Sequence, residues 1–258
     1  MTLGDEERAR YARQIILKEI GGSGQRRIKA ATVVVIGAGG IGSPAIAYLA
    51  GAGIGRLVII DDDRVDASNL QRQILFAAND VGAQKADRAA DAARRRNPHV
   101  VIDALTERIT AGNASTLLAG ADVVLDGCDN FVTRLVVADA ALALRIPLVS
   151  AAVGQFEGQL ATYRGWEADK PCYRCLVGAN PDRDEASCAE QGVLGPVTGI
   201  LGSMAALEAI RAMTPFGLDP AGRLTLVDLL DLRFRTIRVP KDPACPACAP
   251  GRDGASGD

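Results

Sequence analysis

Short apolar runs rich in β-branched residues alternate with helical patterns along the first half of the chain. We read the runs as strands and the periodic segments as helices, since strands repeat apolar positions at a period of 2 and helices at about 3.6. Strands are predicted at 32–36, 57–60, 100–104, 122–125 and from 147, and helices at 44–52, 85–96 and 133–144. This alternation predicts an α/β fold: a doubly wound, Rossmann-like, mostly parallel sheet with helices on both faces.

The pattern differs at the two ends of the chain. Residues 6–20 have helical spacing, and the glycine-rich residues 21–24 are expected to break that helix. Later we predict strands at 158–163 and within 223–238, a helix at 199–213 and an exposed loop at 177–191. Strands joined by turn residues predict a C-terminal antiparallel portion. We expect one domain with three parts and a disordered tail: 1–250, divided into 1–30, 31–152 and 153–250, and then 251–258.

The composition narrows the class of protein. The 258 residues are 48% hydrophobic and 23% charged, with a net charge of −2, which argues against nucleic acid as the main partner. No apolar run approaches the roughly 20 residues that cross a bilayer, and the polar N-terminus has no apolar signal-peptide segment. We therefore predict a cytoplasmic protein with no membrane partner. In that compartment the six cysteines are expected to be metal ligands, reactive thiols or small buried residues rather than disulfides.

A glycine-rich loop follows the first predicted strand of the sheet. It reads Gly37-Ala38-Gly39-Gly40-Ile41-Gly42, and a helical pattern comes after it. Such a loop lets backbone amides approach a phosphate at a helix N-terminus. Asp61 ends the next strand, 19 residues after Gly42, where a carboxylate accepts hydrogen bonds from ribose hydroxyls. These residues predict a nucleotide site, and on their own they leave an NAD-dependent dehydrogenase open.

Charged residues near the ends of the other predicted strands favour a triphosphate. Arg72 and Lys85 suit triphosphate charge, and Asp129 suits a hydrated Mg²⁺ ion. A hydride-transfer enzyme needs no such set, since its cofactor's phosphates do not react. Surface charges or ion pairs would explain any one of these residues alone, but the set and its placement favour ATP.

The chain resembles the MoeB/ThiF/HesA family, bacterial relatives of the ubiquitin-activating enzymes. The resemblance runs from about residue 6 to residue 248. Besides the glycine loop, it is carried by residues 10–15, 61–63, 68–73, 82–85, 129–130, 156–159, 171–175 and 245–248. It implies ATP-dependent adenylation of the C-terminal glycine of a small ubiquitin-like sulfur-carrier protein that ends in Gly-Gly, a nucleotidyltransfer that produces a carrier acyl-adenylate and pyrophosphate.

Roles for single residues follow from this resemblance. It implies that Asp61 holds the ribose, that Asn69, Arg72 and Lys85 contact phosphates, and that Asp129 carries Mg²⁺. The nucleotide-binding set as a whole is Gly37, Gly39, Gly40, Gly42, Asp61, Asp63, Asn69, Arg72, Gln73, Lys85, Asp129 and Asn130. Arg13 resembles an arginine that reaches the site of the other subunit, which implies a homodimer.

The cysteines divide into two pairs and two single residues. Cys172/Cys175 and Cys245/Cys248 have the same Cys-x-x-Cys spacing and supply four thiolates for a structural Zn²⁺, with a redox dithiol or unbound cysteines as the alternative. The resemblance suggests that Cys188 forms a covalent link to the carrier; the alternative is a spare cysteine in the loop. Cys128, at the end of an apolar strand, is expected to be a small buried residue.

The substrate stays open among carriers for molybdopterin, thiamine or cysteine synthesis or tRNA thiolation. The resemblance slightly favours the molybdopterin carrier over the thiamine one. Because the chain ends at residue 258, we expect no appended sulfurtransferase domain and a separate sulfur-donor protein. Two other classes remain as alternatives: an NAD-dependent oxidoreductase, and a non-catalytic scaffold that binds a ubiquitin-like partner.

Overall fold

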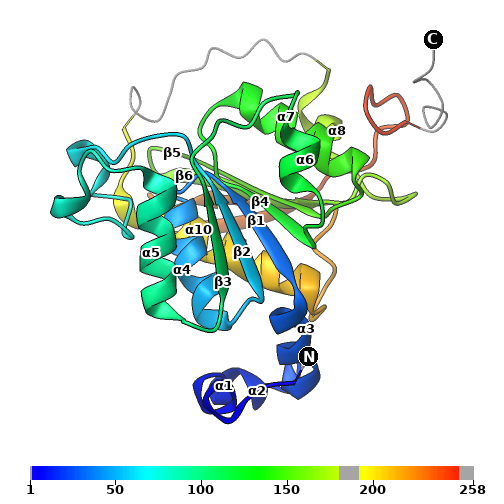
Figure 1. The fold of residues 1–258 in the computed structure, drawn as a ribbon. Coiled ribbons are helices and arrows are strands. Elements are labelled where there is room, and N and C mark those ends of the chain that lie inside the picture. Colours follow the sequence, from blue (N-terminus) through cyan, green and yellow to red (C-terminus); the bar gives the residue numbers. More distant parts are fainter. Residues whose placement is uncertain (1, 180–191, 250–258) are drawn as a thin grey trace.

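A mixed β-sheet forms the centre of the computed structural model, which describes residues 2–179 and 192–249 (Figure 1). In this part of the chain the sheet has eight strands in the order β3-β2-β1-β4-β5-β6-β7-β8. The strands are β1 (Thr32–Ile36), β2 (Arg56–Ile60), β3 (Val101–Leu105), β4 (Val123–Asp126), β5 (Leu148–Gly154), β6 (Glu157–Tyr163), β7 (Arg223–Asp228) and β8 (Arg233–Arg238).

The sheet has a parallel part and an antiparallel part. Strands β3, β2, β1, β4 and β5 pair in parallel. Strands β5 to β8 pair antiparallel and extend the same sheet. The predicted fold class, a mostly parallel doubly wound sheet with a C-terminal antiparallel portion, is confirmed.

Helices cover both faces of the sheet. One face carries α4 (Gly42–Ala52), α5 (Lys85–Arg96) and the long α10 (Gly195–Met213), and the other carries α6 (Ala114–Leu118) and α7 (Phe131–Ala143), with α8 (Tyr173–Val177) beside α7 (Figure 1). The boundaries of α5 agree with the prediction, whereas α10 begins four residues earlier than expected because Pro196 fits its first turn.

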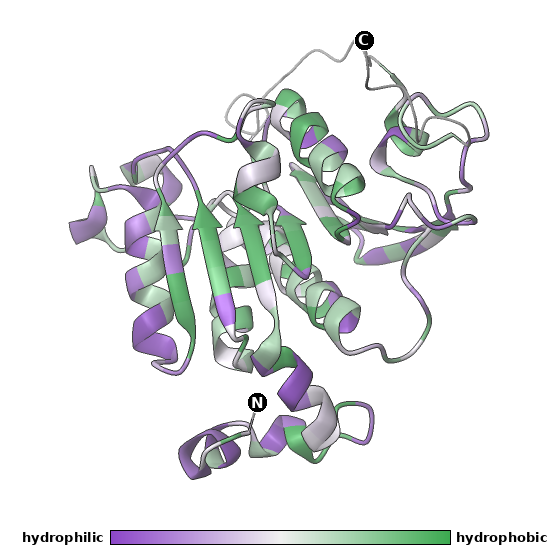
Figure 2. Ribbon diagram, turned by 45° about the vertical axis from the view of Figure 1, so that its right-hand side comes forward, coloured by the Kyte–Doolittle hydropathy of each residue, from purple (hydrophilic) through white to green (hydrophobic). Residues whose placement is uncertain are grey.

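Two separate hydrophobic cores result from the alternation along the strands. Val33 and Val35 of β1 point into the core under α4, α5 and α10. Val34 and Ile36 point into the core under α6 and α7. Figure 2 shows the apolar strands at the centre and polar residues on the outer helices. The period of 2 in a β-branched run therefore fixes which side chains meet which layer.

The N-terminal segment differs from the prediction. A single helix over 6–20 was expected, but two short helices, α1 (Asp5–Arg10) and α2 (Ala12–Ile15), are followed by α3 (Gly21–Ala30). The small residues at 21–24 therefore begin a helix rather than end one. A Cβ on Gly24 would lie 2.8 Å from Oγ1 of Thr214, so this glycine allows α3 to approach the end of α10.

Two short 3₁₀ turns that were not predicted, η1 (Ala67–Asn69) and η2 (Ala78–Asp80), lie between β2 and α5. Most of the expected loop at 177–191 and the tail at 251–258 lie outside the described residues. In the part of the chain that the structure describes, no helix has both the length and the apolar character needed to cross a membrane.

Candidate functional site

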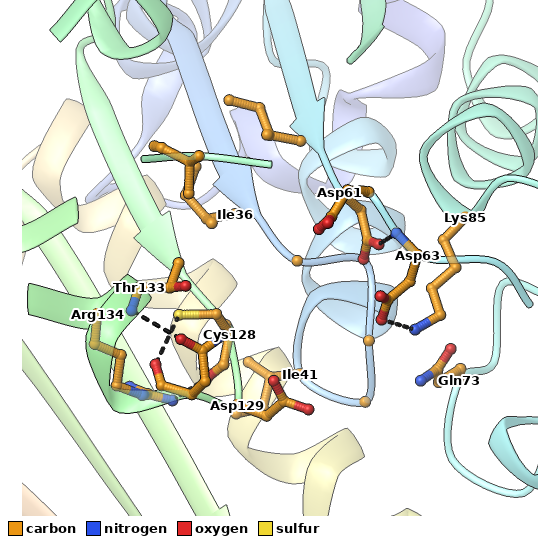
Figure 3. A pocket seen from close by; sticks show the side chains of 18 of the residues that line it. Ile36, Ile41, Asp61, Asp63, Gln73, Lys85, Cys128, Asp129, Thr133 and Arg134 are labelled. Carbon is orange, nitrogen blue, oxygen red and sulfur yellow. Dashed lines mark hydrogen bonds and ion pairs between the residues drawn. The ribbon is translucent and has the colours of Figure 1, made fainter. Parts of the chain in front are cut away.

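A cavity of about 500 Å³ opens at the carboxyl ends of β1, β2 and β4. The strand order changes direction here, since β2 lies on one side of β1 and β4 on the other, and doubly wound sheets bind ligands at this point. Figure 3 shows Asp61, Asp63 and Lys85 on one side of the loop that follows β1, and Cys128 and Asp129 on the other. Most of the predicted nucleotide-binding residues line it: Gly37, Gly39, Gly40, Asp61, Asp63, Arg72, Gln73, Lys85, Asp129 and Asn130.

The glycines of the loop between β1 and α4 have different surroundings. Gly37 has a φ of +84°, a conformation that favours glycine. A Cβ on Gly42 would lie 1.8 Å from the carbonyl oxygen of Gly37, and one on Gly40 would lie 2.9 Å from Cγ2 of Thr198 in α10. A Cβ on Gly39 would have no neighbour closer than Nε2 of Gln73, at 3.8 Å. Gly39 is therefore the loop residue that leaves open space in the cavity.

Asp61 is a buried acid at the end of β2. Its Oδ2 accepts a hydrogen bond from the backbone N–H of Ala38 at 2.7 Å, and its Oδ1 accepts one from the N–H of Asp63 at 2.9 Å. Burial raises the pKa of Asp61 above its ordinary value of 3.8, although the two hydrogen bonds act in the opposite direction. The carboxylate is fixed beside the glycine loop, where it can accept hydrogen bonds from a ribose.

Lys85 is the first residue of α5, and only 8% of its side chain is exposed. Its Nζ donates to Oδ2 of Asp63 at 2.7 Å, and its backbone N–H donates to the carbonyl of Asp63 at 2.9 Å. The ion pair satisfies the charge of a nearly buried ammonium. Since an ammonium has three N–H donors, Lys85 can contact an anion in the cavity while keeping Asp63.

Arg72 and Gln73 enter the cavity from the turn after η1. Nη1 of Arg72 donates to the carbonyl of Ser68 at 3.0 Å. Gln73 is 3% exposed, and within the described residues its Oε1 has no hydrogen-bond partner. A buried acceptor without a donor costs free energy, so this amide oxygen is suited to a donor on a bound molecule.

The segment after β4 forms the opposite wall. The Asp129 side chain is exposed to the cavity, and Oδ1 of Asn130 accepts from the N–H of Thr133 at 2.8 Å and so caps α7. Cys128, expected to be buried, is half-buried and lines the cavity. Its Sγ donates to Oδ1 of Asp126 at 2.7 Å, and burial raises the pKa of the thiol well above its ordinary value. This cysteine is therefore a neutral donor rather than a nucleophile.

Three of the predicted site residues that the structure describes do not lie in the cavity wall. Asn69 is half-buried in η1, where its Oδ1 accepts from the N–H of Asp66 at 3.4 Å. Gly42 lies behind the loop, against Gly37. Arg13 is exposed on α2, which lies at the end of the sheet opposite the cavity (Figure 1). Cys188 falls outside the described residues.

Other residues of the wall were missed by the sequence analysis. Thr198 of α10 and residues 107–109, which follow β3, line the cavity, and so does Arg134 of α7. Thr198 comes from a helix more than 150 residues from the glycine loop, a distance in sequence that no local pattern bridges. Arg134 had a usable signal, because it is a charged residue in an otherwise apolar helical stretch and is 8% exposed in the structure.

The four paired cysteines gather in a second place, between α8 and the C-terminal end of the described chain. Their Sγ atoms all lie within 4.8 Å of one another. The Sγ atoms lie 3.4 Å apart in Cys175–Cys248, 3.5 Å apart in Cys172–Cys245 and 3.8 Å apart in Cys172–Cys175. A tetrahedral zinc with Zn–S bonds of about 2.3 Å places its sulfurs about 3.8 Å apart. The cluster therefore fits Zn²⁺.

One of the four thiols is stabilised as a thiolate. The hydrogen bond from Cys172 lowers the pKa of Cys175 to about 5, whereas the same hydrogen bond raises the pKa of Cys172 and burial raises that of Cys248 to about 11. A cluster that stabilises a thiolate is prepared for a cation, since the thiolate is the form that binds zinc. All four ligand positions would be filled by cysteines, which describes a structural site rather than a catalytic one.

Comparison with known proteins identifies relatives along nearly the whole chain. A sulfur carrier protein adenylyltransferase of Thermus thermophilus is 44% identical, with 94% of this chain and 91% of that protein covered. A sulfur carrier protein ThiS adenylyltransferase of Escherichia coli is 41% identical, with 95% and 97% covered. A molybdopterin-synthase adenylyltransferase of Salmonella typhimurium is 38% identical, with 95% and 98% covered.

A solved structure has the same fold. The crystal structure of Escherichia coli MccB with ATP matches with a TM-score of 0.80 at 22% identity, and the match covers 93% of this chain and 74% of that one. The family model described as the ThiF family matches residues 11–247. The chain therefore belongs to the ThiF family.

Proposed function

We propose that this protein is a nucleotidyltransferase that uses ATP to adenylate the C-terminal glycine of a small ubiquitin-like sulfur-carrier protein. The observation that carries the proposal is the cavity, where a glycine loop, two cations and an acidic residue converge in a chain of the ThiF family. The named relatives are adenylyltransferases of such carriers. A dehydrogenase would use the loop but not Arg72, Lys85 and Asp129 together.

The chemistry needs no general base. A C-terminal carboxylate has a pKa of about 3.5 and is already ionised at neutral pH. One of its oxygens attacks the α-phosphorus of ATP, the bond from that phosphorus to the bridging oxygen breaks, and pyrophosphate leaves with the electron pair. The difficulty is to bring two anions together and to stabilise charge on the leaving group, which positioned cations do.

Each residue of the cavity has a proposed role that follows from its position. Asp61 holds the ribose, and the open side of Gly39 lets backbone amides approach the phosphates. Arg72 and Lys85 contact the phosphate chain, and Asp129 holds Mg²⁺ from the opposite wall. The metal supplies charge neutralisation on the phosphates. Asn69, half-buried in η1, supports the turn that carries Arg72.

The proposed enzyme acts as a homodimer. Arg13 lies at the end of the sheet away from its own cavity, so a role in the reaction requires the cavity of a second copy. Apolar side chains for such an interface are exposed at the antiparallel edge of the sheet: Leu230, Leu232 and Phe234, at 71%, 72% and 56%. Exposed apolar residues at the edge of a sheet are an expected site of contact between two protein chains.

Carrier identity, sulfur source and location complete the proposal. The relatives named for the thiamine and molybdopterin carriers have similar identities, 41% and 38%, so the preference for the molybdopterin carrier still rests on the resemblance alone. A separate donor supplies sulfur to the activated carrier, and Cys188 forms a covalent link to the carrier. An ATP-consuming reaction fits the cytoplasmic location expected from the sequence.

The decisive experiment is ATP–pyrophosphate exchange with Mg²⁺ and a panel of purified carriers ending in Gly-Gly. We expect exchange with one carrier, and a loss of at least about 100-fold in Arg72→Ala and Asp129→Ala, the size of effect seen when one group that stabilises transition-state charge is removed. Arg95→Ala, which changes an exposed arginine on α5 away from the cavity, serves as the matched control and should keep the wild-type rate.

Three outcomes separate the alternatives. Exchange that survives in Asp129→Ala would contradict the assigned role of this carboxylate. A folded protein that binds ATP and a carrier but exchanges with none would favour the scaffold. Tight binding of NADH that excludes ATP would favour the oxidoreductase.

A further inference from the structure

Arg134 lies inside the cavity wall that carries Asp129, and its guanidinium bridges two strands. Nη1 donates to Oδ2 of Asp126 and to Oγ of Ser150, each at 3.1 Å. Nη2 donates to the carbonyl of Ala151 at 2.7 Å and to the carbonyl of Cys128. The acceptors belong to the end of β4, to the segment after it and to β5. One side chain thus connects the end of β4 to the middle of β5.

These contacts use the donors that would otherwise be offered to a ligand. A guanidinium has five N–H groups, and the four on Nη1 and Nη2 match the four acceptors within the chain. Arg134 is 8% exposed, whereas Arg72 is half-buried with one hydrogen bond to its own turn. Arg72 and Arg134 therefore have different roles. Arg72 can bind phosphate, whereas Arg134 connects parts of the protein to one another.

The opposite charges of Arg134 and Asp126 stabilise this set of contacts. Burial lowers the pKa of Arg134, but Asp126 and the other acidic groups around the guanidinium together outweigh that effect and raise the pKa, so the guanidinium stays charged. Asp126 is 1% exposed and also accepts from Oγ of Ser150 at 3.0 Å and from Sγ of Cys128 at 2.7 Å. A buried ion pair held by several further hydrogen bonds is rigid, since breaking the pair leaves an uncompensated charge.

The segment held by this pair is the one that carries Asp129. Arg134 bonds the carbonyl of Cys128, directly before Asp129, and the Asn130 side chain caps α7 directly after it. Residues 127–130 are neither helix nor strand. The N–H of Gly127 donates to the carbonyl of Ile36 at 3.0 Å and the N–H of Cys128 donates to Oδ1 of Asp126 at 3.1 Å, and the contacts of Arg134 and Asn130 add to these in fixing the Asp129 backbone. The aspartate is fixed on both sides and its side chain remains exposed to the cavity.

We propose that Arg134 is a positioning residue: by bonding the Cys128 carbonyl it sets the place of the Asp129 carboxylate, and thereby the affinity of the site for the magnesium ion of ATP. The inference rests on the proposed function only in taking Asp129 as the Mg²⁺ ligand. It predicts that changes at Arg134 act on the metal through Asp129 and leave metal-free nucleotide binding unchanged.

The test compares ATP binding in EDTA with ATP binding in saturating Mg²⁺, for the wild type and for Arg134→Lys. The lysine keeps a positive charge beside Asp126 but has one nitrogen in place of two, so it cannot span both strands. We expect the dissociation constant in EDTA to stay within about twofold, and the gain in affinity from Mg²⁺ to fall by about 10- to 100-fold, the loss typical when a group that orients a metal ligand is removed.

Two matched variants show whether the effect passes through Asp129. Asp129→Ala should lose the same Mg²⁺ gain, and adding Arg134→Lys to it should cause no further loss, because a residue that acts through another has nothing left to act on. Arg164→Lys changes an arginine paired with Asp219 away from the cavity and should keep the full gain. Ser150→Ala removes one of the four acceptors and should shift the gain in the same direction, by less.

The results that would overturn the proposal are distinct from those that would overturn the adenylation. An unchanged Mg²⁺ gain in folded Arg134→Lys, equal weakening in EDTA and in Mg²⁺, or a further loss in the double variant would each contradict it. So would a wild type without a Mg²⁺ gain. If Arg134→Lys does not fold, Ser150→Ala decides in its place, and an unchanged gain there overturns the proposal. Binding needs no carrier, so the absence of exchange with every carrier would contradict the proposed function alone.

Discussion

The glycines of the loop after β1 have separable tasks at the scale of single residues. Gly42 lets the loop close on itself, since a Cβ there would lie 1.8 Å from the carbonyl oxygen of Gly37. Gly39 faces the cavity, where a Cβ would meet little of the protein but would occupy the space that we propose for a phosphate. One sequence motif thus combines a requirement of folding with a requirement of binding.

Replacing each glycine by alanine should separate these two requirements. We expect Gly42→Ala to lower the free energy of unfolding by about 1–3 kcal/mol or more, because the clash forces the backbone to move. Gly39→Ala should leave the free energy of unfolding nearly unchanged and weaken ATP binding by about tenfold or more, a loss of about 1.4 kcal/mol. Urea unfolding and calorimetric titration with ATP measure the two effects, and equal destabilisation by both substitutions would contradict this division.

The sequence predicted the residues of the site that stand close to a strand end. Asp61, Lys85 and Asp129 follow strands or begin the next helix, and parallel strands bring their carboxyl ends together. It did not predict that Thr198 of α10 lies against the glycine loop, or that Arg134 lines the cavity. Thr198 depends on the packing of a helix distant in the chain, whereas Arg134 bonds Asp126 across only eight residues, and its charge in a mostly apolar helix is a local signal. The assigned roles of the site residues remain predictions.

At the scale of elements, periodicity predicted the central strands and the main helices but not the N-terminal segment. The strand runs are β-branched and buried on both faces, so tertiary contacts and local preference agree. The N-terminal helices are instead held by particular contacts. Tyr11 is 1% exposed and its hydroxyl accepts from Nδ2 of Asn97 at 2.8 Å, a pairing across 86 residues of chain that no local pattern reveals.

A partly buried ion pair joins α1 to α3 and makes the stability of this segment depend on pH. Nζ of Lys29 donates to Oε2 of Glu7 at 2.5 Å, and the N–H of Gly4 donates to the same oxygen at 2.9 Å. Burial raises the pKa of Glu7, but these bonds outweigh it, and the folded-state pKa lies below the ordinary value of 4.5. The stabilisation is therefore complete above pH 4.5 and is lost as the pH falls through the lowered pKa.

We expect Glu7→Gln to lower the free energy of unfolding by about 1–3 kcal/mol at neutral pH, the size of a hydrogen bond to a charged group. The difference from the wild type should shrink as the pH falls below 4.5, because the wild-type carboxylate is then protonated too. Urea unfolding at a series of pH values gives this difference. Glu19→Gln, in an exposed pair with Lys18 at 3.6 Å, is the control and should change little. A difference independent of pH would contradict the assignment.

At the scale of the whole molecule, the antiparallel strands continue the parallel sheet, and the cysteine cluster then joins the end of the described chain back to α8. The Cys172–Cys245 contact spans 73 residues. A bond across such a loop removes conformations from the unfolded chain, by an amount that the chain-entropy argument puts at about 4 kcal/mol. A bound zinc would make this connection without a disulfide, which fits the cytoplasmic location proposed above.

Loss of a bound zinc should therefore lower the stability of the fold and leave the proposed nucleotide site intact. Protein purified without chelators should hold about one zinc per chain. Cys245→Ala should lose the metal, and the midpoint of thermal unfolding should fall by roughly 10 °C if the metal contributes as such a cross-link does. Metal analysis and calorimetry measure both quantities, and Cys188→Ala, which leaves both Cys-x-x-Cys pairs intact, should keep both. Since the cluster cysteines do not line the cavity, folded Cys245→Ala should still bind ATP. Full stability of Cys245→Ala without zinc would contradict a structural metal and favour unbound thiols.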